Sequence, residues 1–280
     1  MADVRLIHGD NAEVMRALHD AGERFTLAYL DPPFFTGRDF ETATGEHAYS
    51  DKWGSVDEYL AALMQRAELA FNLLADSGCI VIHVDPTVSH YVKVWCDSKF
   101  GHKNFASEIV WRYRRWPAQC RNFQAMHDVL LRYVTGRAEP TFNQLYEPLS
   151  ASTLDRSDGK QMRKVSAAGN KRTSFTGEKS PGSPLSDVWE ISIVAPSGDE
   201  RTGYPTQKPE ALIARIVDAL TNEGDAVLDP FCGSGTVPAV CARRGRRCVS
   251  IDQSPVAIRY ASERLAPILA QPSLFGGARA

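Results

Sequence analysis

The sequence has no apolar run of about 18 residues or more, so we expect no membrane-spanning helix. None of its six cysteines stands in a C-x-x-C pair, which argues against a zinc site or a thioredoxin-like motif, and we expect no bound metal. The N-terminus has acidic residues where a secretory signal needs a basic start and an apolar middle. The cysteines are scattered through apolar stretches, which suits reduced thiols and predicts a cytoplasmic protein.

An excess of charge of one sign is also missing. The 280 residues include 32 lysines and arginines against 34 acidic residues, and this net charge of −2 excludes a uniformly basic surface but not a local basic cleft. The charge is uneven along the chain, because residues 151–185 hold seven basic and three acidic side chains. By composition this segment is either a solvated loop or an interaction surface.

The chain as a whole is ordinary globular sequence, 43% hydrophobic and 24% charged, and long enough for a large core. Short apolar runs alternate with helical periodicity, which predicts an α/β fold with a mostly parallel sheet and helices on both faces. The predicted strands cover 5–8, 26–30, 79–84, 127–134, 226–228 and 248–251, and the predicted helices cover 12–19, 56–74, 209–220 and 236–244.

A glycine-rich turn follows the predicted strand 226–228, with the sequence Asp229-Pro230-Phe231-Cys232-Gly233-Ser234-Gly235-Thr236. Glycines let a backbone approach a ligand closely, and Asp252, 19 positions after Gly233, can accept hydrogen bonds from ribose hydroxyls. The turn lacks the lysine of a phosphate-binding P-loop, and Pro238 stands at the third glycine position of a dinucleotide fingerprint. The pattern predicts a site for a nucleoside cofactor without a pyrophosphate, with a purely structural turn as the alternative.

A second stiff turn, Asp31-Pro32-Pro33-Phe34, follows the predicted strand 26–30. Two consecutive prolines fix two φ angles and remove two N–H donors. The Asp31 carboxylate and the Pro32 carbonyl can therefore accept both hydrogens of an exocyclic amine, while Phe34 stacks on the ring that carries it. The alternative is a proline turn that merely ends a strand.

Together these two turns resemble the motif pair of the S-adenosylmethionine-dependent DNA amino-methyltransferases, and their order along the chain resembles the circularly permuted β group of that family. Supporting strings are similar to family patterns as well, and they lie at 9–11, 49–53, 83–85 and 205–209. The resemblance implies a methyltransferase sheet of the seven-stranded type, with one catalytic domain built from 1–135 and 204–270. It also implies a target-recognition insert over 136–203 and leaves 271–280 as a tail.

The resemblance further implies methyl transfer from S-adenosylmethionine to the N6 amine of an adenine flipped out of double-stranded DNA. Asp31, Pro32, Pro33 and Phe34 would be the catalytic residues, with Phe34 standing where many family members have Tyr. Lys208 would provide the countercharge for the cofactor's carboxylate. The implied cofactor-binding residues are Asp10, Asn11, Ala12, Asp31, Thr206, Gln207, Lys208, Asp229, Pro230, Phe231, Gly233, Gly235, Thr236, Asp252, Gln253 and Ser254.

Two basic segments are the expected DNA contacts. The first, at 111–116, alternates positively charged side chains with aromatic rings. An edge strand with one exposed face would show the same alternation. The second segment lies in the insert expected over 136–203. The expected contacts are Arg112, Arg114, Arg115, Trp116, Arg163, Lys164, Lys171 and Arg172. His127 and Asp128 are interpreted as scaffold, without a chemical role.

The resemblance also has implications for the protein's binding partners and its location in the cell. It allows a homodimer and a cognate restriction endonuclease, and it implies association with the nucleoid through DNA. Asp at the first catalytic position favours adenine, and a cytosine-N4 methyltransferase is the main alternative. An RNA or protein amine methyltransferase and a non-catalytic DNA-binding relative are the remaining alternatives.

Overall fold

The computed structural model describes residues 3–116, 119, 121–167 and 170–270. Contacts divide the chain into two compact units, Met1–Phe142 with Asp187–Ala280, and Asn143–Ser186. The second unit is shorter than the insert expected over 136–203, because the residues on either side of it pack with the first unit. The expected tail, 271–280, lies outside the described residues. Among the described helices, none combines the length and the apolar composition that a bilayer crossing requires.

The first unit is built on an eight-stranded sheet. Its strand β7 runs antiparallel to both neighbours, β5 and β6, while the other neighbouring pairs are parallel. In spatial order the strands are β1 (Val4–His8), β14 (Arg247–Asp252), β13 (Ala226–Asp229), β2 (Phe25–Leu30), β5 (Leu74–Val84), β7 (His127–Val134), β6 (Phe105–Arg112) and β12 (Val188–Glu190).

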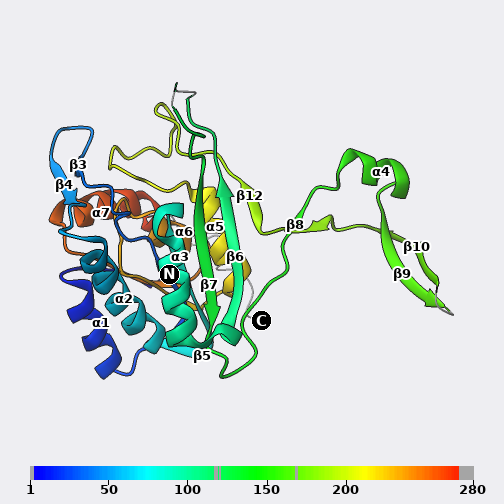
Figure 1. The fold of residues 1–280 in the computed structure, drawn as a ribbon, viewed down its shortest axis with the longest axis horizontal. Coiled ribbons are helices and arrows are strands. Elements are labelled where there is room, and N and C mark those ends of the chain that lie inside the picture. Colours follow the sequence, from blue (N-terminus) through cyan, green and yellow to red (C-terminus); the bar gives the residue numbers. More distant parts are fainter. Residues whose placement is uncertain (1–2, 117–118, 120, 168–169, 271–280) are drawn as a thin grey trace. The chain divides into compact units, whose positions relative to one another are not determined.

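Helices cover both faces of this sheet, as Figure 1 shows. On one face α1 (Asn11–Asp20) packs on α2 (Val56–Asn72), which packs on α3 (Pro86–Cys96). On the other face α5 (Glu210–Leu220) packs on α6 (Thr236–Arg243), which packs on α7 (Pro255–Leu269). The π-helical turn Asp97–Gly101 and the 3-10 turn His102–Asn104 follow α3.

The central strands are buried on both faces, which is why they read as continuous apolar runs. Leu27, Ile80, Ile82 and Leu130 are fully buried. The mostly parallel α/β fold is therefore confirmed. The sheet has one strand more than the seven-stranded type: the edge strand β12 comes from the segment assigned to the insert. Helices α3 and α7 and the small hairpin of β3 (Asp39–Glu41) and β4 (His47–Ser50) were not among the expected elements.

Three strands lead directly into residues that cap the next helix. Asp10 follows β1, Asp85 follows β5 and Ser254 follows β14, and each side chain accepts a hydrogen bond from a first-turn amide of its helix. Because these strands run parallel, the three helix starts lie at one edge of the sheet. Candidate site residues are therefore delivered to the same edge from both ends of the chain.

The second unit has its own, simpler organisation. A two-stranded pairing of β8 (Tyr146–Glu147) with β11 (Ser183–Pro184) and a short helix, α4 (Ala151–Ser157), accompany an antiparallel hairpin of β9 (Lys160–Ala167) and β10 (Asn170–Lys179). Of the two alternatives left open for this region, the solvated loop is therefore wrong for the two strands of the hairpin. Its backbone hydrogen bonds are made between the two strands, so the hairpin needs no long apolar run.

Candidate active site

The site lies where the sheet changes its direction of winding. From β13 the chain passes through α6 to β14 on one side, and from β2 it passes through α2 to β5 on the other. Crevices outside the carboxyl ends of strands at such a point are the usual ligand sites of open α/β sheets. Here a cavity of about 780 Å³ opens at that point, lined by residues from both chain ends.

All four residues of the Asp-Pro-Pro-Phe turn line this cavity. The Lys208 ammonium donates to both carboxylate oxygens of Asp31, at 2.7 Å each, and lies 4.7 Å from the centroid of the Phe34 ring. Lys208 thus bonds to the Asp31 carboxylate, the group predicted to be catalytic. The family resemblance implies that Lys208 pairs with the carboxylate of a cofactor, and that role remains a proposal.

A buried carboxylate that we did not predict as functional supports the turn. Asp51 is 1% exposed and accepts hydrogen bonds from the Phe35 amide, the Thr36 amide and hydroxyl, and the Trp53 indole, at 2.6 to 3.0 Å. Phe35 has a backbone φ of +60°, a left-handed conformation that residues other than glycine rarely adopt. Asp51 therefore stabilises a strained backbone immediately after Phe34. The signal in the sequence that could have identified Asp51 is its place in the family-like string at 49–53.

The glycine turn forms the opposite wall. Gly233, at φ +49°, donates its amide to Asp252 at 2.9 Å, and the Ser254 amide donates to the same carboxylate at 2.8 Å. Burial raises the pKa of Asp252, although these two bonds oppose the shift. Gly235 has φ +74° and lies so close to α7 that a Cβ would come within 2.7 Å of Ala261. Gly235 therefore serves helix packing.

Asp229 lies beneath this turn and not on the cavity surface. It is 1% exposed and accepts from the Ser250 hydroxyl at 3.0 Å and from the Phe231 amide at 3.3 Å. Burial raises the pKa of Asp229 to about 8, against the effect of these bonds. The arrangement makes Asp229 a support for the turn.

The start of α1 brings a further group to the cavity. Asp10 caps the helix through the Ala12 and Glu13 amides and pairs with Arg66 at 3.1 Å, so its carboxylate is already engaged. Arg66 also donates to Asn11 at 2.6 Å. Asn11 and Arg66 line the cavity, whereas Asp10 and Ala12 do not. Arg66 lies within a helix, and no motif singled it out.

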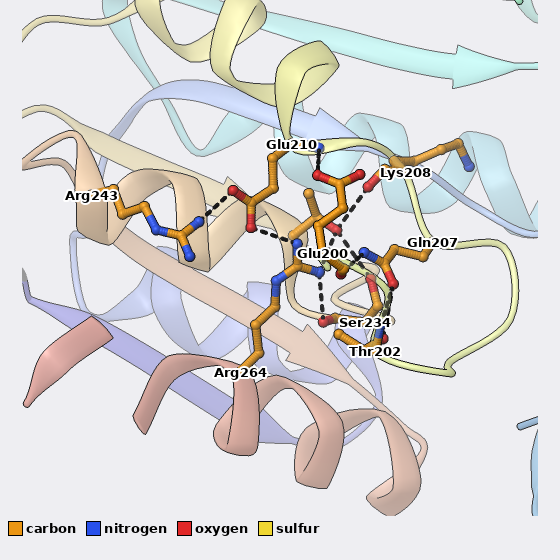
Figure 2. Close-up of polar contacts among 9 residues, drawn as sticks. Glu200, Thr202, Gln207, Lys208, Glu210, Ser234, Arg243 and Arg264 are labelled. Atoms are coloured by element: carbon orange, nitrogen blue, oxygen red, sulfur yellow. Dashed lines mark hydrogen bonds and ion pairs between the residues drawn. The ribbon is translucent and has the colours of Figure 1, made fainter. Parts of the chain in front are cut away.

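The loop that carries Lys208 is anchored by a polar network, shown in Figure 2. Gln207 accepts from the Thr202 amide at 2.9 Å and donates to the Glu200 carbonyl at 2.7 Å, which closes the loop on itself. Arg264 pairs with Glu210 at 2.7 Å and donates to Thr236, whose hydroxyl donates to the Lys208 carbonyl at 3.1 Å. The Lys208 side chain extends away from this network, so Gln207 holds the loop while Lys208 reaches the cavity.

The cavity thus gathers most of the predicted catalytic and cofactor residues. Those that line it are Asn11, Asp31, Pro32, Pro33, Phe34, Thr206, Lys208, Pro230, Phe231, Gly233, Thr236, Asp252, Gln253 and Ser254. Those that do not are Asp10, Ala12, Gln207, Asp229 and Gly235. Within the described ranges, His, Cys, Asp and Glu side chains form no group of three or more that could hold a metal.

The four predicted DNA contacts that belong to the first unit are not among the residues that line the cavity. Arg112 pairs with Glu190 across strands β6 and β12, and Arg115 donates to the Tyr113 hydroxyl at 3.0 Å. Arg114 and Trp116 are exposed. The remaining four belong to the β9–β10 hairpin by backbone, and their side chains are outside what the structure describes: Arg163, Lys164, Lys171 and Arg172.

Comparisons with known proteins agree with this geometry. The family profile described as DNA methylase matches residues 25–263. The type II methyltransferase M2.DpnII of Streptococcus pneumoniae is 43% identical, over 93% of this chain and 88% of its own. The DNA adenine methyltransferase YhdJ of Escherichia coli K12 is 28% identical, over 93% of this chain and 82% of its own.

Among solved structures, an M1.HpyAVI–SAM complex shares the fold, with a TM-score of 0.63 at 21% identity over 94% of this chain and 99% of that one. The profile covers the Asp-Pro-Pro-Phe turn, the glycine turn and the strands that carry them. The chain belongs to the DNA methylase family.

Proposed function

We propose that this protein transfers a methyl group from S-adenosylmethionine to the N6 amine of adenine in double-stranded DNA, at a specific sequence. One observation carries the proposal: the Asp-Pro-Pro-Phe turn and the glycine turn, about 200 residues apart in the chain, open onto one cavity. YhdJ is named as an adenine methyltransferase, which supports adenine over cytosine.

The residues of the cavity fit the cofactor. Gly233 and Asp252 offer a turn without a side chain beside a carboxylate, which suits a ribose with its hydroxyls. Lys208 offers a cation and Phe231 an apolar ring. S-adenosylmethionine bound there would supply an activated methyl group on a positively charged sulfur.

The protein's own share of the chemistry falls to the catalytic turn. The Asp31 carboxylate and the Pro32 carbonyl accept the two amine hydrogens, which orients the nitrogen and stabilises the positive charge that develops on it. Phe34 stacks on the extruded base, a contact that contributes about 1–3 kcal/mol. Lys208 donates to both Asp31 oxygens, and each oxygen keeps a second lone pair with which it can accept from the amine.

Target recognition and assembly are further parts of the proposal. We infer that residues 136–203 read the DNA sequence, with the β9–β10 hairpin supplying the basic side chains, and that Arg114, Arg115 and Trp116 also contact DNA. A circularly permuted chain order, a homodimer, a cognate restriction endonuclease and association with the nucleoid remain predictions from the family resemblance.

A labelling experiment tests the function. The protein is incubated with unmethylated double-stranded DNA and S-adenosylmethionine carrying an isotopic methyl label; the DNA is then digested and the labelled nucleoside identified. We expect N6-methyladenine. Label on cytosine N4 would replace adenine as the target, and label only on RNA or protein substrates offered in parallel would overturn the assignment to DNA. Complete absence of label would favour a non-catalytic DNA-binding relative.

A further inference from the structure

A buried histidine lies directly behind the catalytic carboxylate. His83, near the end of β5, has no exposed surface. Its Nδ1 is 2.8 Å from the Tyr29 hydroxyl and 3.8 Å from Oδ1 of Asp31, and its Nε2 is 3.2 Å from Oδ2 of Asp128. An imidazole between two carboxylates, one of them catalytic, is the arrangement that moves a proton in many enzymes.

The neighbours of His83 assign its tautomer. Burial alone would raise the pKa of Asp128, but the hydrogen bonds from His83 and Tyr113 and the charge of Lys208 act to lower it. Asp128 is therefore a carboxylate, which only accepts, and Nε2 must carry the hydrogen. The Tyr113 hydroxyl, itself held by Arg115, donates to the other oxygen of Asp128 at 2.8 Å.

The free lone pair of the neutral ring is then on Nδ1. Burial, with the nearby charge of Asp31, raises the pKa of Tyr29 well above its ordinary value, so Tyr29 keeps its proton and donates to Nδ1. The ring is also held in place, because its centroid is 5.5 Å from that of Phe34 and 5.6 Å from that of Trp111. The basic nitrogen of His83 therefore faces Tyr29 and Asp31 in a fixed orientation.

We propose that His83, paired with Asp128, accepts the proton that leaves the substrate amine through Asp31. The inference rests on the proposed function. The amine nitrogen bonds to the methyl carbon as that carbon's bond to sulfur breaks, and the positively charged nitrogen releases one proton to Asp31. That proton then moves to Nδ1 as the Tyr29 hydroxyl turns away and the two side chains close the 3.8 Å between them. The step leaves a neutral methylated amine, an ionised Asp31 and an imidazolium paired with Asp128.

The position of Lys208 explains why Asp31 is not the final acceptor. Both oxygens of Asp31 accept from the Lys208 ammonium, so a proton that stayed on Asp31 would compete with that ammonium. His83 has no such competitor, since Tyr29 can turn its hydroxyl and accept from a protonated Nδ1. His83 and Asp128 are thus positioning residues that act through Asp31.

The first test uses single-turnover methyl transfer as a function of pH, in His83→Gln and Asp128→Asn variants. We expect the wild-type rate to fall toward low pH, because acid opposes release of the amine proton. His83→Gln should be about 100-fold slower and lose that acidic limb, and Asp128→Asn should be about tenfold slower. Tyr133→Phe is the matched control, because it removes a buried hydroxyl on β7 that donates to Asp97 at 2.7 Å, and its profile should equal that of the wild type.

The second test needs no catalysis. In wild-type protein with ¹⁵N-labelled histidine, NMR of the ring nitrogens should show His83 with its hydrogen on Nε2, and Asp128→Asn should abolish that preference. An Nδ1-protonated neutral ring in the wild type, or an unchanged acidic limb in a folded His83→Gln variant, would overturn the proposal. A wild type that transfers no methyl group to DNA would instead contradict the proposed function.

Discussion

Each of the two compact units of this chain is stabilised internally in a different way. The first contains a sheet whose central strands are fully buried, whereas Ser157 is the one buried residue among those of Asn143–Ser186 whose burial the structure describes. The two strands of the β9–β10 hairpin pair with each other through backbone hydrogen bonds, and an isolated two-stranded hairpin is marginally stable in water. The comparison teaches that the cavity lies at the edge of a buried sheet, whereas the residues of the second unit whose burial is described gain little stability from burial.

The largest expected effect tests whether the chemistry belongs to the first unit alone. Asp31→Ala removes the acceptor of the amine proton, and we expect methyl transfer to fall about 1,000-fold or more while S-adenosylmethionine and DNA still bind. Single-turnover rates and equilibrium binding measure the two effects separately. Turnover near the wild-type level would refute the role given to Asp31.

Replacing residues 143–186 with a glycine–serine linker tests directly whether the two units contribute separately to DNA binding and to stability. Since phosphate contacts dominate DNA affinity, we expect that affinity to fall about 100-fold at constant salt. The first unit should melt within about 3 °C of the intact protein and bind the cofactor equally well. A large loss of melting temperature would mean that the first unit depends on the second for its stability.

A smaller effect is expected from Asp51→Asn, within the first unit. Asparagine keeps one acceptor oxygen, so its NH2 group must face the amide of either Thr36 or Phe35 and cannot accept from it. The strained backbone at Phe35 then loses support at a cost of about 1–3 kcal/mol. We expect kcat to fall about tenfold with cofactor affinity unchanged, because the catalytic turn is displaced and the glycine turn is not. Asp39→Asn, in the same hairpin but paired with Lys52 at the surface, is the control and should change neither value.

The smallest effect concerns pH and the stability of the sheet edge. Because the pKa of Asp229 in the folded protein is raised to about 8, the folded state retains a proton that the unfolded state releases at lower pH. Stability from this group is therefore full below the ordinary carboxyl range and is lost as pH rises toward about 8. Asp229→Asn should raise the melting temperature at pH 8 by about 3 °C.

The same measurement at about pH 5 should show a smaller gain for Asp229→Asn, since more of the wild-type protein then carries the proton. Asp20→Asn, an exposed carboxylate on α1, serves as the control. An equal gain at both pH values would show that Asp229 is not the titrating group.

Much of the candidate site could be predicted because its signals are local. The prolines after Asp31 stiffen a turn wherever it lies, and the glycines at 233 and 235 permit backbone angles that other residues resist. Apolar periodicity likewise predicts the strands that end at these turns. The hairpin in 160–179 escaped prediction because its polar composition outweighed its weak alternation.

By itself, then, the sequence determined the α/β class, the family and the two turns. Only the tertiary structure decided the partners of their side chains. Lys208 reaches Asp31 across 177 positions of the chain, and Asp128 meets His83 across 45. In the folded chain the Gln207 side chain holds a loop closed, and the Asp10 side chain caps a helix. Such contacts depend on which strands become neighbours and which way each loop packs, and those are properties of the whole folded chain.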